Sequence, residues 1–144
     1  MATQLSKNFT LEEVCKSSTA IKNGIKNIPN KAEKDSLIAL AENILQPLRD
    51  HFDEPIKIGS GYRCDKLNKA VGGVSNSQHM KGEAVDLCID GDKAKGKKWF
   101  DYIRYNLDFD QLIWEHNKKG SYWVHVSYKK AGNRHSVIEN LLKK

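Results

Sequence analysis

The sequence predicts an α+β protein in which helices pack on a small, mostly antiparallel sheet. The first half of the 144-residue chain carries apolar side chains at helical spacing, whereas much of the second half alternates apolar with polar residues. Helices that come first, followed by strands that are mostly neighbours along the chain, are typical of this class. No internal repeat or low-complexity linker divides the sequence, so we expect a single domain over residues 1–144.

The first half contains the predicted long helix. Thr10 is the predicted N-cap of a first, short helix, and Glu13 completes a capping box with it. A second helix is predicted over residues 33–51, where Pro47 is expected to kink or shorten it. The apolar stripe of this helix consists of Leu37, Ile38, Ala41, Ile44, Leu45 and Leu48.

From Pro55 onward the pattern changes, and most of the predicted strands follow. In chain order we expect a strand at 55–58, a short helix at 64–70, a strand at 84–89, a helix from Asp92 to about residue 105, strands at 109–115 and 122–128, and a last helix at roughly 135–142. Asn117 and Gly120 lie between the last two strands, which predicts a hairpin there.

Composition and charge narrow the class of protein. Hydrophobic residues make up 39% of the chain, and no apolar run approaches the roughly 18 residues of a membrane span. The start lacks the apolar stretch of a secretory signal, so we expect synthesis in the cytoplasm. The three cysteines lie far apart without a CxxC motif, and we expect reduced thiols rather than a cysteine-based zinc site.

The net charge of +6 leaves two interpretations open. Basic residues cluster at positions 93–98, 118–119, 129–130 and 143–144. A basic surface suits a polyanion such as nucleic acid, an anionic membrane or an anionic cell wall, but it also serves solubility alone. We expect no nucleic-acid partner, because no helix-turn-helix, zinc-finger or aromatic RNA-binding signature is present.

Three residues in the second half have side chains that bind metals. His125 stands between Val124 and Val126 in a predicted strand, so burial of the valines turns its imidazole to the opposite face. Asp86 shares a strand face with small side chains, which leaves room for an ion, and His79 lies seven positions before it. Histidine nitrogens and carboxylate oxygens build catalytic zinc sites. Taken alone, such a histidine is more often an ordinary hydrogen-bonded residue, and a seven-residue interval between a histidine and an aspartate is common by chance.

The surrounding motifs resemble a known family. In chain order they are Ser60-Gly61-Tyr62-Arg63, Leu67-Asn68, Val71-Gly72-Gly73, Ser77-Gln78-His79, Gly82, Ala84, Asp86, the segment 109–115 and the segment 123–127. Together they resemble the zinc D-alanyl-D-alanine carboxypeptidase type of peptidase, and within it the short phage and bacterial members related to endolysins. The resemblance covers roughly residues 8–130 and implies the core fold that this group shares with the amino-terminal domain of hedgehog proteins.

The resemblance also implies a site. The implied zinc ligands are His79, Asp86 and His125, with water in the fourth position. Arg63 is the implied substrate arginine, and its guanidinium can hold a carboxylate or a developing oxyanion. Ser77 and Gln78 are candidate substrate-binding residues.

The general base departs from the family pattern. Many relatives carry an acid three residues before the last histidine ligand, and others carry a histidine two residues before it; here these positions are Tyr122 and Trp123. Glu115 is the best remaining acid, and the short members carry a glutamate at the end of this strand. If the hairpin pairs His116 with Tyr122, Glu115 becomes a diagonal neighbour of His125, about 7–8 Å away at the backbone. A one-residue slip would instead move His125 to the face of His116.

Other candidates are set aside. Alternation places Asp110 on the face opposite Glu115, and His51 and His135 lie on predicted helical stretches and are expected at the surface. Trp114 and Trp123 are expected to pack, and one of them could line the substrate cleft.

Together these features predict a zinc metallopeptidase that hydrolyses amide bonds in peptidoglycan stem peptides, as a D-Ala-D-Ala carboxypeptidase or as an endopeptidase of endolysin type. The alternative is a non-catalytic zinc-binding module of the same fold that binds the cell wall or a protein partner, which the missing acid at Tyr122 favours. We expect a monomer that reaches the wall after release or lysis.

Overall fold

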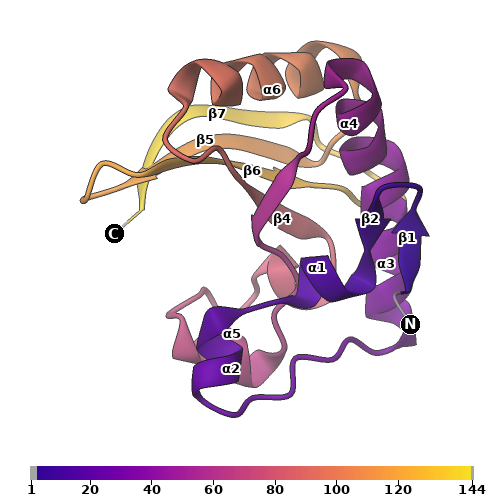
Figure 1. Cartoon of the computed structure of the whole chain (residues 1–144), viewed down its shortest axis with the longest axis vertical. Coiled ribbons are helices and arrows are strands. Elements are labelled where there is room, and N and C mark those ends of the chain that lie inside the picture. Colours follow the sequence, from indigo (N-terminus) through magenta and orange to yellow (C-terminus); the bar gives the residue numbers. More distant parts are fainter. Residues whose placement is uncertain (1–2, 144) are drawn as a thin grey trace.

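The computed structural model describes residues 3–143 and confirms the α+β class (Figure 1). The main sheet has the strand order β3-β4-β6-β5-β7, and its neighbours are antiparallel except for the parallel pair β5 and β7. The strands are β3 (Lys57–Ser60), β4 (Ala84–Cys88), β5 (Gln111–Asn117), β6 (Tyr122–Ser127) and β7 (Ser136–Lys143). Helix α6 (Lys93–Asn106) covers one face of this sheet, and Asp92 caps it as predicted.

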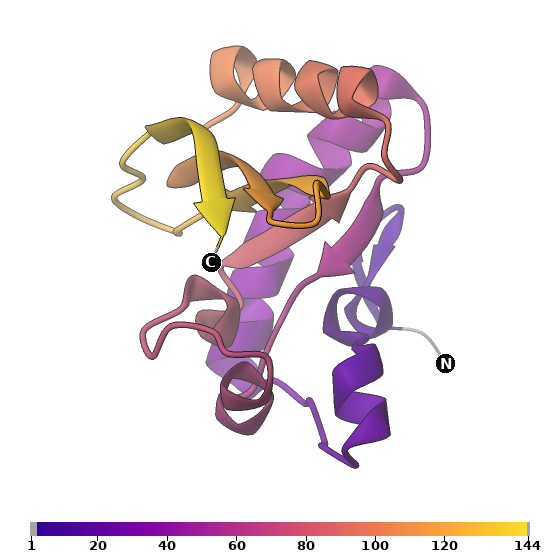
Figure 2. The same ribbon diagram turned by 90° about the vertical axis from the view of Figure 1, so that its left-hand side faces the viewer.

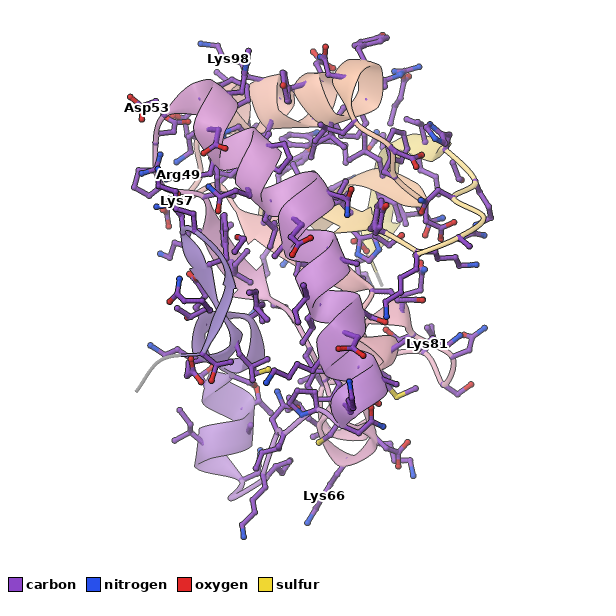
Figure 3. All side chains as sticks on the ribbon, turned by 90° about the vertical axis from the view of Figure 1, so that its right-hand side faces the viewer. Lys7, Arg49, Asp53, Lys66, Lys81 and Lys98 are labelled. Atoms are coloured by element: carbon purple, nitrogen blue, oxygen red, sulfur yellow. The ribbon has the colours of Figure 1, made fainter. Side chains whose placement is uncertain are left out.

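A long helical segment packs beside the sheet and runs along the molecule (Figure 3). It consists of α3 (Lys31–Leu40), the π-helical turn η1 (Ala41–Leu45) and α4 (Gln46–Phe52). The predicted stripe is buried, apart from the half-buried Ile38. Pro47 does not shorten the helix. Proline lacks an N–H and clashes with the carbonyl four residues earlier in a regular α-helix. Here the wider π turn η1 lies just before Pro47, so the regular hydrogen-bond ladder is interrupted at this point while the helix continues.

Shorter elements lie beyond the other face of the sheet (Figures 1 and 2). They are β1 (Gln4–Ser6), β2 (Phe9–Thr10), α1 (Leu11–Cys15), α2 (Ser18–Lys22), α5 (Asp65–Ala70) and the 3₁₀ turn η2 (Gln78–Lys81). Thr10 and Glu13 form the predicted capping box of α1. Among residues 3–143, no helix has the length and apolar character needed to span a membrane.

The register of the hairpin formed by β5 and β6 is the predicted one. His116 pairs with Tyr122 in the β5–β6 hairpin, and Asp86 of β4 pairs with His125 of β6. Trp114 packs edge-on against Phe100 of α6, which identifies the apolar face of the sheet. The fully buried residues Val85, Leu87, Val124 and Val126 alternate with Asp86 and His125. The two polar residues therefore lie on the face away from α6.

The carboxyl-terminal segment is a strand, so the prediction of a helix at 135–142 was wrong. β7 runs parallel to β5, with Ile138 opposite Ile113 and Leu141 opposite Glu115. The apolar residues of this segment also fit a helical spacing, but β5 otherwise has an unpaired edge, and backbone pairing with it decides the conformation. His135 is likewise not helical: it precedes β7 with a φ of 53°.

Gly61 is predicted to be essential where the segment after β3 packs against α1. A Cβ at Gly61 would lie 2.1 Å from the carbonyl oxygen of Val14, which also accepts a hydrogen bond from the Tyr62 N–H at 2.8 Å. We expect Gly61→Ala to lower the free energy of unfolding by about 1–3 kcal/mol, because backbone must move to make room. Urea denaturation measures the loss.

Gly59→Ala is the matched control, because a Cβ there would find its nearest neighbours at 3.4 Å. We expect this variant to stay within about 1 kcal/mol of the parent. Equal losses in the two variants would contradict the close approach at Gly61.

Candidate metal centre

Three side chains from separate elements meet on the face of the sheet away from α6. His79 of η2, Asp86 of β4 and His125 of β6 each offer one ligand atom, and these atoms lie within 4.8 Å of one another. Asp86 Oδ1 is 2.9 Å from His125 Nδ1 and 3.6 Å from His79 Nε2. In a tetrahedral zinc site with bonds of ~2.1 Å, ligand atoms are ~3.4 Å apart. The three side chains could therefore share one ion with little movement.

The position of His79 depends on the short elements rather than on the sheet. The carbonyl of Gly61 accepts a hydrogen bond from His79 Nδ1 at 2.7 Å. The other ring nitrogen, Nε2, is therefore free to act as a ligand on the side of Asp86. Metal-binding histidines commonly donate their other ring N–H in this way. The Ser77 hydroxyl accepts from the His79 backbone N–H at 3.2 Å, and Gly82 ends the turn with a φ of 72°.

The electrostatics of the cluster favour a cation. Burial by itself would raise the pKa of Asp86, but the neighbouring His79 and the hydrogen bond with His125 outweigh burial and hold that pKa well below its usual range. Asp86 is thus an ionised carboxylate with only 16% of its side chain exposed. A nearly buried carboxylate that faces two imidazoles is suited to binding a divalent metal.

Arg63 is a buried cation beside this cluster. Its residue is 9% exposed, and Nη2 donates to Ser77 Oγ at 3.3 Å. The Nε atom is buried and has no hydrogen-bond partner among the described residues. Burial lowers the pKa of Arg63, whereas Asp86 and Glu115 raise it. A buried donor without a partner is costly, so this guanidinium is well placed to receive an anion.

Glu115 lies on the same sheet face, near the cluster. It pairs with Trp123 and is diagonal to His125, as the predicted hairpin register requires. The indole N–H of Trp123 donates to Glu115 Oε1 at 3.0 Å. His116 stacks on Tyr122 with ring centroids 4.8 Å apart and is absent from the cluster. Trp123, which was expected to pack or to line the cleft, therefore orients the candidate base.

A second carboxylate, Asp110, supports the site indirectly. Gln78 Nε2 donates to Asp110 Oδ2 at 3.0 Å, and Arg134 binds the same carboxylate through Nε at 3.0 Å and Nη2 at 2.8 Å. Strand alternation predicted that Asp110 would lie on the face opposite Glu115. Asp110 precedes β5, however, so strand alternation does not determine the direction of its side chain. It connects the residue before His79 to the segment that leads into β7. The sequence offered no signal for Arg134.

A cleft of about 690 Å³ joins these groups. Every predicted site residue lines it: Arg63, Ser77, Gln78, His79, Asp86, Glu115 and His125. Other parts of its lining come from the loop around Gly73 and from β7. A second cavity of about 560 Å³ shares Arg63 with this cleft.

A cluster of two histidines and one aspartate in an open cleft, with an acid and an arginine nearby, is typical of metal-dependent hydrolases. The sequence profile of the Peptidase M15 family matches residues 7–127, and the chain belongs to this family. The family resemblance of the motifs is thereby confirmed.

A curated relative is the zinc D-Ala-D-Ala carboxypeptidase of Streptomyces albus G, which is 36% identical over 81 residues. The aligned segment covers 56% of this chain and 31% of the relative. The chain thus matches about a third of the length of that protein.

The Asp110–Arg134 pair is predicted to stabilise the protein down to acidic pH. Hydrogen bonds from Arg134 outweigh burial and hold the pKa of Asp110 well below its usual range. Because the folded pKa is depressed, the contribution is complete above the unfolded pKa of about 3.9, and it is lost progressively as the pH falls through the folded pKa.

We expect Asp110→Asn to lower the free energy of unfolding by about 1–3 kcal/mol at pH 7. The expected loss of stability is modest because the Arg134 side chain is 55% exposed and solvent screens the ion pair. Urea denaturation at pH 7 and pH 3 measures the effect, and the gap between parent and variant should narrow at pH 3. An unchanged gap would contradict the depressed pKa.

Proposed function

We propose that this chain is a zinc-dependent peptidase that hydrolyses an amide bond in peptidoglycan stem peptides. The observation that carries the proposal is the meeting of His79, Asp86 and His125 in a cleft that also contains Glu115 and Arg63. Membership of a peptidase family and the name of the curated relative support the reaction and the substrate. Such a protein would act at the cell wall.

His79 Nε2, His125 Nδ1 and Asp86 would hold the zinc ion. Two imidazoles and one carboxylate suit zinc, and three protein ligands leave a position for water. When bound, zinc would lower the pKa of that water towards about 7 and polarise the substrate carbonyl.

Glu115 is the proposed general base. Its carboxylate takes a proton from the attacking water and passes it to the leaving amine. The hydrogen bond from Trp123 Nε1 holds one carboxylate oxygen in place during this transfer. A glutamate on β5 thereby takes the role that an acid near position 122 has in many relatives.

Arg63 is the proposed anion-binding residue. Its Nε is buried without a hydrogen-bond partner among residues 3–143, and its guanidinium is held beside Ser77. Both features suit a substrate carboxylate or the oxyanion that develops during attack. The Ser77 hydroxyl already accepts hydrogen bonds from Arg63 and from the His79 backbone. The Gln78 side chain already donates hydrogen bonds to Asp110 and Glu83. We therefore propose that both residues act chiefly by positioning their neighbours.

The metal site is tested by zinc content. The purified protein is expected to bind one zinc ion per chain, and chelation with EDTA should abolish activity until zinc is restored. We expect His125→Ala to lose most of the zinc, because one of three ligands is removed. Elemental mass spectrometry measures the stoichiometry.

His116→Ala is the matched control, since His116 lies on the same hairpin but outside the cluster. It should keep its zinc. Full zinc occupancy in a folded His125→Ala variant would refute the assignment of this ligand.

The role of Glu115 is tested by Glu115→Gln, which keeps the size of the side chain and an acceptor for Trp123. We expect kcat to fall by about 10²–10⁴-fold while zinc is retained, because the proton acceptor is lost. Mass spectrometry of fragments released from peptidoglycan measures turnover and identifies the bond that is cleaved, which also distinguishes a carboxypeptidase from an endopeptidase.

Turnover at the parental rate in Glu115→Gln would show that Glu115 is not the base. A zinc-loaded parent that releases no fragment would favour the non-catalytic module instead. Trp123→Phe is expected to lower kcat less than Glu115→Gln does, with the substrate KM unchanged.

A further inference from the structure

One wall of the cleft comes from a strand outside the family-matched segment. The family profile ends at residue 127, whereas β7 begins at Ser136. Ile138, Leu141 and Lys143 of β7 line the same cleft as Glu115 and His125. We call these three residues the β7 wall; the strand is yellow in Figure 2.

The β7 wall is held firmly to the rest of the site. The backbone N–H of Ser136 donates to the carbonyl of Asp110 at 2.9 Å, and β7 then pairs with β5 along its length. Arg134 binds the Asp110 carboxylate, which also accepts from Gln78. One buried residue therefore fixes both the start of β7 and the turn that carries His79.

The charge of the cleft favours an anionic ligand. Two carboxylates, those of Asp86 and Glu115, line it. The cations lining it are Arg63, Lys81, Lys129, Arg134 and Lys143, of which Arg134 is already paired with Asp110. In the β7 wall, apolar Ile138 and Leu141 stand beside Lys143, whose Nζ lies 5.9 Å from the centre of the Trp123 ring. This combination suits a peptide that carries a carboxylate next to apolar groups.

The sheet gives the distance at which this group would be bound. β6 and β7 flank β5, so the β7 wall lies two strand spacings, roughly 10 Å, from the strand of His125. Lys143 is opposite Asn117, four residues along β5 from the level of His125, so its backbone lies about 16 Å from that of His125. An extended peptide that advances about 3.3 Å per residue would need about five residues to reach from the scissile bond to Lys143. Arg63 follows β3, at the opposite edge of the sheet from β7.

We propose that the β7 wall determines substrate specificity by binding a carboxylate-bearing part of the peptide about five residues from the scissile bond, on the side away from Arg63. Lys143 pairs with the carboxylate, and Leu141 covers the neighbouring apolar atoms. This inference rests on the proposed peptidase function.

The test compares two synthetic stem peptides that differ only in a free carboxylate or a carboxamide at the position about five residues from the scissile bond. The parent is expected to favour the carboxylate peptide by about threefold to fivefold in kcat/KM, as for an exposed ion pair. Lys143→Gln should remove this preference through KM, with kcat unchanged. Lys98→Gln, an exposed lysine on α6 (labelled in Figure 3), should keep it.

Leu141 and Leu142 provide a matched pair for the apolar contact. They are neighbours, 37% and 45% exposed, but only Leu141 lines the cleft. Leu141→Ala should raise KM severalfold for both peptides, whereas Leu142→Ala should leave KM unchanged. Circular dichroism establishes that each variant is folded.

Calorimetric binding of both peptides to zinc-loaded Glu115→Gln, alone and combined with Lys143→Gln, separates this inference from the proposed function. Selective binding that depends on Lys143, without turnover in the parent, would sustain the β7 wall and reject the peptidase. Turnover with the same preference in the parent and in Lys143→Gln would reject the β7 wall alone. Absence of both binding and turnover would overturn both.

Discussion

The antiparallel pairing of β4 with β6 is the constraint on which the site depends. It places Asp86 opposite His125, so that Oδ1 and Nδ1 lie 2.9 Å apart. The same register buries Val85 and Val126 on the other face, against the core under α6. A slip of one residue would turn the carboxylate into that core and expose each valine, at about 1.5–3 kcal/mol per side chain. The apolar core thus enforces the geometry of the polar cluster.

The position of His79, the third member of the cluster, depends on the amino-terminal half of the chain. His79 is on a single 3₁₀ turn, and its ring is oriented by the carbonyl of Gly61. Gly61 can lie where it does only because it has no side chain to meet Val14 of α1. The short amino-terminal elements, which contribute nothing to the main sheet, are therefore part of what places His79 beside Asp86.

The family motifs, together with local patterns, predicted the cluster better than its surroundings, because the cluster and its surroundings depend on different interactions. Valines on either side of His125 determine the direction of its side chain locally, and the hairpin loop fixes the register of Glu115. The strand β7 depends on a long-range partner, the edge of β5, and its apolar residues fit a helical spacing equally well. The hydrogen bond of Trp123 to Glu115 and the contact of Arg134 with Asp110 depend on side-chain directions that no local pattern encodes.

The unbalanced charge of the cleft links stability to the proposed function. Arg63 is buried, and its Nε donor has no partner within the described segment 3–143. Burial also lowers the pKa of Arg63, so these contacts leave the guanidinium incompletely satisfied. Neutralising it with another internal acid would stabilise the fold and occupy the position that an anionic substrate needs. Asp110 shows this alternative in the same cleft region: its pair with Arg134 is saturated, and it serves to hold β7 in place. Arg134 thus has an internal carboxylate partner, whereas Arg63 Nε has no hydrogen-bond partner in the part of the chain that the structure describes, and this difference is why we propose an anion-binding role for Arg63 alone.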